Sequence, residues 1–64
     1  MIGYVAKDKD GEIYLHEEEP TYHEDSGYWF SPRAELHITG AFPKFDSISY
    51  KDRPIKVEIK LERV

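Results

Sequence analysis

The chain contains no cysteine, so it has no disulfide framework, no thiolate nucleophile and no thiolate metal ligand. Small secreted scaffolds usually depend on such cross-links, and their absence is compatible with a reducing compartment. Long apolar runs are also missing, because the apolar start, residues 1–6, is followed at once by Lys7-Asp8-Lys9-Asp10. A signal peptide or a membrane span needs a longer apolar stretch, so we expect a cytoplasmic protein with no membrane partner.

Clustered positive charge is absent too. The basic residues after position 30 are spaced out and interleaved with acids; they are Arg33, Lys44, Lys51, Arg53, Lys56, Lys60 and Arg63. Nucleic-acid backbones are bound by clustered cations, so we expect no nucleic-acid partner. Negative charge does gather: residues 8–25 hold eight carboxylates against Lys9 alone, in a chain whose net charge is −4.

The signs of catalysis are few. Sixty-four residues predict a single small β-domain, 1–64, which buries only about 60% of the surface of its unfolded chain and has little room for an enclosed active site. No nucleophile-elbow motif surrounds the serines, and no glycine-rich loop suits a phosphate. A Ser-His pairing in three dimensions stays open. We expect no enzyme activity and no cofactor.

Strand patterns are the strongest signals that the sequence contains. Residues 55–64 alternate branched apolar and charged side chains, which predicts a half-buried strand starting after Pro54. Residues 2–6 and 12–16 are β-prone runs on either side of Asp10-Gly11, and they predict a hairpin.

The middle of the chain is more ambiguous. Polar residues 17–27 predict a long surface loop, and Tyr28-Trp29-Phe30 predicts a strand in which Trp29 points opposite to its neighbours. Residues 32–39 fit either a two-turn helix or a strand, and their alternation favours the strand. Residues 41–46 then suit an irregular connector, and residues 47–50 a short strand.

These elements predict an all-β fold, a small antiparallel meander of four to five strands that forms an open barrel or a sandwich of SH3-like size. Large apolar side chains on the predicted strands and connectors define the expected core, which is Ile2 or Val5, Ile13, Leu15, Phe30, Leu36, Ile38, Phe42, Tyr50, Val57, Ile59 and Leu61.

Two stretches contain metal-ligand residue types. His16, His23, Glu24 and Asp25 lie in the acidic segment 16–25, but their spacing matches no metal motif, and a solvated acidic loop explains the same residues. Residues 8–17 overlap a calcium-binding loop at several positions, although Ala6 stands where its first Asp belongs and the flanks favour strands. We therefore expect no metal at either stretch.

Aromatic residues are abundant. Five Tyr, three Phe and one Trp are more than one small core readily absorbs, and surplus Tyr and Trp are typical of protein-binding surfaces. We expect an exposed patch of Tyr22, Tyr28 and Trp29.

Residues 3–15, taken with Gly27-Tyr28-Trp29 and residues 54–59, resemble segments of the short uncharacterised β-rich proteins of gut bacteria and their prophages. The resemblance implies a small intracellular β-protein with a phage-related role and transfers no functional residue.

Two functions follow from these features. The first is a non-catalytic protein-binding module that uses the aromatic patch or a sheet edge to engage another protein. The second is an inhibitor whose acidic or metal-binding loop, residues 16–25, imitates phosphates.

Overall fold

The computed structural model describes residues 2–59 of the 64-residue chain. These residues form six short strands, which are β1 (Ile2–Lys7), β2 (Ile13–His16), β3 (Thr21–His23), β4 (Tyr28–Phe30), β5 (Glu35–His37) and β6 (Ile55–Glu58). One 3₁₀ helix, Pro43–Phe45, lies between β5 and β6. The predicted all-β class is confirmed.

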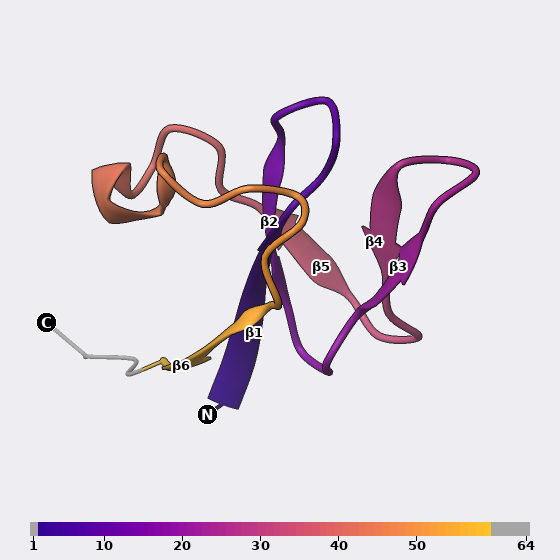
Figure 1. Cartoon of the computed structure of the whole chain (residues 1–64). Helices are drawn as coiled ribbons and strands as arrows, with labels where there is room; N and C mark the ends of the chain where they lie inside the picture. Colours follow the sequence, from indigo (N-terminus) through magenta and orange to yellow (C-terminus); the bar gives the residue numbers. More distant parts are fainter. Residues whose placement is uncertain (1, 60–64) are drawn as a thin grey trace, which may run out of the picture.

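The strands form two antiparallel sheets (Figure 1). One has four strands in the order β5-β2-β1-β6, and the other is a two-stranded ribbon of β3 and β4. The described residues thus form six strands in two sheets, where the sequence predicted four to five strands in one meander. The order of the four-stranded sheet is not that of a meander, because β1 pairs with β6 and β2 with β5 although neither pair is consecutive in the sequence.

The predicted first hairpin is confirmed. Gly11 has a φ of 94° in its turn, the left-handed geometry that an Asp-Gly turn supplies. Val5 and Ala6 are only 1% and 2% exposed, and neighbouring strand residues point to opposite faces, so both faces of β1 are covered. In Figure 1 the β3–β4 ribbon and the 3₁₀ helix lie on opposite sides of this hairpin.

The predicted loop over residues 17–27 is wrong in its middle, because Thr21–His23 forms β3. Tyr22 lies directly opposite Trp29 of β4, and this aromatic pair stabilises the ribbon. The residues around Tyr22 are polar, so the sequence pattern did not indicate a strand there. Gly27, with a φ of 78°, permits the tight turn, in which its N–H donates to the carbonyl oxygen of His23 at 2.8 Å.

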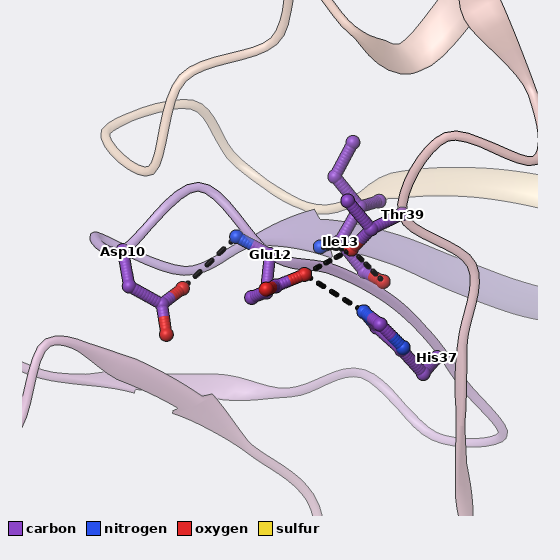
Figure 2. A network of polar contacts seen from close by, with 5 residues as sticks. All are labelled: Asp10, Glu12, Ile13, His37 and Thr39. Atoms are coloured by element: carbon purple, nitrogen blue, oxygen red, sulfur yellow. Dashed lines mark hydrogen bonds and ion pairs between the residues drawn. The ribbon is translucent and has the colours of Figure 1, made fainter.

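The strand favoured for residues 32–39 is confirmed as β5, where Leu36 pairs with Leu15 of β2. A polar network fastens the residues after this strand to the first hairpin (Figure 2). Thr39 Oγ1 accepts a hydrogen bond from the Ile13 N–H at 2.7 Å and donates one to the Glu12 carboxylate at 2.6 Å. The same Glu12 oxygen lies 2.8 Å from His37 Nε2.

The short strand predicted for residues 47–50 is absent, because this stretch forms turns after the 3₁₀ helix. The Asp46 N–H donates to the carbonyl oxygen of Pro43 and the Ile48 N–H to that of Phe45, so the backbone here bonds locally and not to a neighbouring strand. Pro54 precedes β6 as predicted, and residues 60–64 of the predicted last strand lie outside the described residues.

Apolar side chains between the sheet and the 38–55 segment make the core. Its members, buried or partly buried, are Val5, Ile13, Ile38, Phe45, Leu15, Ile48, Ile55 and Val57. Three predicted members are wrong, since Phe30, Leu36 and Phe42 are 50%, 61% and 49% exposed. A fourth, Tyr50, is half-buried and lies outside this cluster. Phe30 lies on the face of the ribbon opposite to Trp29, Leu36 lies on an edge strand, and Phe42 precedes the 3₁₀ helix that contains the buried Phe45. Of the alternatives Ile2 and Val5, Val5 is buried, and Leu61 lies outside the described residues.

Candidate functional site

The three residues of the predicted aromatic patch lie on two faces of the β3–β4 ribbon. Tyr22 and Trp29 are cross-strand partners and share one face, whereas Tyr28 pairs with His23 on the other. Tyr28 is 41% exposed and packs edge-on against Phe30, with 6.2 Å between ring centroids. The structure therefore keeps Tyr22 and Trp29 together and separates Tyr28 from them.

A third ring completes the cluster on the Tyr22 face. Tyr50, from the turns before β6, lies 5.9 Å from Tyr22 between ring centroids, and Trp29 lies 5.2 Å from Tyr22. All three rings are tilted and half-buried. Such a cluster combines apolar ring faces with polar edges, a combination common in binding surfaces.

Trp29 is fixed from two directions. Its backbone N–H donates to Asp8 Oδ1 at 2.8 Å, and its indole Nε1 donates to the carbonyl oxygen of Tyr50 at 3.2 Å. The Asp8 side chain is only 4% exposed, and burial raises the pKa of its carboxyl above the ordinary value. Because a first-hairpin residue and a late turn both hold Trp29, the cluster is ordered before any ligand arrives.

The cluster lines an open groove of about 460 Å³, and the full lining is Lys9, Tyr22, Glu24, Trp29, Tyr50 and Lys51. The two lysines flank the Tyr50 ring, with Nζ atoms 6.0 and 5.8 Å from its centroid. We call this the aromatic groove. Burial, with smaller contributions from Tyr50 and Glu24, raises the pKa of the Tyr22 hydroxyl.

A second hollow of about 410 Å³ adjoins the aromatic groove across the Tyr22–Trp29 pair. Both residues line both depressions, so their rings form a ridge between them. The other residues of this second hollow are Glu19, Pro20, Thr21, Arg53 and Pro54. The surface is thus a ridge of aromatic rings with a depression on each side.

The metal candidates of segment 16–25 do not converge. His16 is fully buried in β2, whereas His23 stacks edge-on against Phe30 at 4.9 Å on the ribbon, and Glu24 lines the aromatic groove. Within residues 2–59, no group of three or more His, Asp or Glu side chains is arranged to hold a metal ion. Glu18 of the same segment forms an ion pair with Arg33, with Oε1 lying 3.5 Å from Nε.

The carboxylates of the first hairpin have partners within the protein. Asp10 Oδ1 accepts the Glu12 N–H at 2.9 Å, Glu12 contacts Thr39 and His37, and Asp8 contacts Trp29 (Figure 2). These contacts build a β-hairpin, and the hydrogen bonds to Thr39 and His37 lower the pKa of Glu12. They explain the acidic residues at 8–17 without a calcium ion.

His16 does pair with a serine, but not in a catalytic arrangement. Its Nδ1 lies 3.1 Å from Ser31 Oγ and 3.4 Å from Glu35 Oε2, so the hydroxyl and the carboxylate compete for one nitrogen. A Ser-His-acid triad uses the two ring nitrogens separately. Here Nε2 is buried without a hydrogen-bond partner.

This buried imidazole predicts a pH-dependent stability. Burial, partly offset by Glu35, lowers the pKa of His16 below 6.5. His16 therefore binds a proton more readily in the unfolded chain than in the folded protein. The free energy of unfolding should then fall as the pH drops from about 7 to 5. Midpoints of urea denaturation, measured across this pH range, test the expected fall in stability.

A matched pair of variants isolates the contribution of His16. The His16→Gln variant should show a flatter pH dependence than the wild type, whereas the His23→Gln variant, changed at an exposed position, should keep the wild-type slope. Equal slopes for all three proteins would contradict the assignment. Asp8 acts in the opposite sense, since its raised pKa favours the folded state as the pH falls, and it contributes equally in all three.

Comparison with protein-family models, curated proteins and solved structures found no match for this chain. In the part of the chain that the structure describes, no helix has the length and apolar character needed to cross a membrane.

Three residues of the aromatic groove were not singled out from the sequence. Lys9 comes from the first turn, and Tyr50 and Lys51 come from a segment predicted as a strand and its end. The sequence predicted Tyr50 as a core residue, and only the excess of aromatic residues indicated that some of them lie at the surface. Tyr50 contacts Trp29 of the ribbon although the two residues are 21 positions apart in the sequence. Local sequence patterns do not predict contacts over such a separation.

Proposed function

We propose that the protein is a non-catalytic binding module whose aromatic groove receives an extended segment of a partner protein. The observation that supports this most is the ridge of Tyr22 and Trp29, fixed by Asp8 and Tyr50 and flanked by two depressions. A pre-ordered aromatic surface loses little conformational entropy on binding, and Tyr and Trp dominate binding energy at interfaces.

Tyr22 and Tyr28 form a matched pair for testing this function. Both belong to the same ribbon, but Tyr22 lines the groove and Tyr28 faces away from it. We expect the wild type to enrich peptides from a random twelve-residue display library. Tyr22→Ala should bind the enriched peptides at least about tenfold more weakly, the size of a typical interface anchor, and Tyr28→Ala should bind them as the wild type does.

Trp29 is the only tryptophan, so its fluorescence reports directly on the groove. Titration of an enriched peptide should change the Trp29 emission in the wild type and in Tyr28→Ala. A library that yields no enriched peptide would overturn the proposed function, and so would equal losses in the two tyrosine variants.

A further inference from the structure

The charges around the aromatic groove differ in sign from those of the chain as a whole. The chain carries a net charge of −4, yet the groove and the second hollow together are lined by Lys9, Lys51 and Arg53 against Glu19 and Glu24. Within residues 2–59, none of these three cations takes part in an ion pair. A ligand with carboxylates would therefore meet three cations that form no ion pair in the described part of the chain.

The ridge offers aromatic ring faces, and both N–H groups of Trp29 are already occupied. The indole N–H of Trp29 already donates to Tyr50, and the Trp29 backbone N–H already donates to Asp8. A polyproline II segment suits such a surface, because proline has no backbone N–H to satisfy and its rings pack against aromatic side chains. This helix is also preformed in solution, which lowers the entropic cost of binding.

From these two observations we infer that the ligand is a proline-rich peptide in the polyproline II conformation that carries acidic side chains. This inference rests on the proposed function and specifies the chemistry of the partner. Side chains three residues apart in this helix lie on one side of it, about 9 Å from each other. Two carboxylates on one side of the peptide would meet Lys9 and Lys51, whose Nζ atoms lie 6.0 and 5.8 Å from the centroid of the Tyr50 ring.

Three capped synthetic peptides test the inference by titration against Trp29 fluorescence and amide chemical shifts. The first is PPEPPEPP, the second replaces its glutamates by lysines, and the third keeps the glutamates and replaces every proline by alanine. We expect the first to bind at least about tenfold more tightly than either of the others, and its affinity to fall with added salt.

Charge reversal on the protein provides a second arm. Lys9→Glu and Lys51→Glu should each weaken PPEPPEPP severalfold, whereas Lys44→Glu is the matched control because Lys44 lies in the 3₁₀ helix, on the other side of the first hairpin (Figure 1). All three lysines are exposed, and a dispersed amide spectrum verifies that each variant is folded.

The possible results separate the two proposals. Equal binding of the glutamate and lysine peptides, or of the proline and alanine peptides, would overturn the inferred chemistry and leave the binding function standing. Failure of all three peptides, while library-selected peptides still bind, would overturn the inference in the same way. Failure of both the peptides and the library would overturn the proposed function as well.

Discussion

Replacing Phe45 by alanine is expected to remove a large part of the stability of the protein. Phe45 is 8% exposed and packs in the core with Val5 and Ile13. Removing a buried phenylalanine ring costs about 3–5 kcal/mol, and a domain of this length has a total stability of only roughly 3–10 kcal/mol. Urea denaturation followed by the Trp29 emission and by far-ultraviolet circular dichroism measures the loss.

Phe42 provides the control for this experiment. It lies three residues earlier and contacts the Phe45 ring edge-on at 6.2 Å, but it is 49% exposed. Phe42→Ala should therefore cost about 1 kcal/mol or less. Equal destabilisation by the two changes would mean that Phe45 does not pack in the core as described.

The second large effect is expected at Asp8. Asp8→Ala removes the acceptor for the Trp29 backbone N–H and leaves that donor unsatisfied in a part-buried place, which should cost about 2 kcal/mol. The same change should loosen the ribbon, because Asp8 connects the first hairpin to β4. Urea midpoints give the cost in stability, and the amide signals of residues 21–30 report on the order of the ribbon.

Asp8→Asn separates the hydrogen bond from the charge. The amide oxygen can still accept the Trp29 N–H, and an uncharged side chain avoids the desolvation that raises the pKa of the Asp8 carboxyl. We expect this variant to be as stable as the wild type at pH 7, or more stable. If Asn and Ala destabilise equally, the ionised carboxylate and not its acceptor oxygen is what holds Trp29.

Local patterns predicted the parts of the fold that depend on neighbouring residues. The first hairpin follows from an Asp-Gly turn between two β-prone runs, and the positions of β5 and β6 follow from alternation of apolar and polar side chains. Strand order does not follow from these patterns, because the pairing of β1 with β6 joins residues at least fifty positions apart.

The candidate site was predicted in part for the same reason. The sequence indicated Tyr22 and Trp29, and alternation along 28–30 already separated Tyr28 from Trp29. Only the pairing of β3 with β4 places Tyr22 on the Trp29 face. The segment with Phe42, Phe45 and Tyr50 has no period, so local reasoning could not decide which ring enters the core and which one joins the groove.

The position of β1 between β2 and β6 has a consequence for how the chain acquires its fold. The turn to β2 is short, and hairpins of this kind close within about ten microseconds, whereas pairing with β6 requires closure of a loop that includes almost the whole chain. Until Ile55–Glu58 is available, one side of β1 presents bare amide and carbonyl groups. During synthesis on the ribosome, β1 therefore has an unpaired sheet edge, and such edges are templates for pairing with other chains.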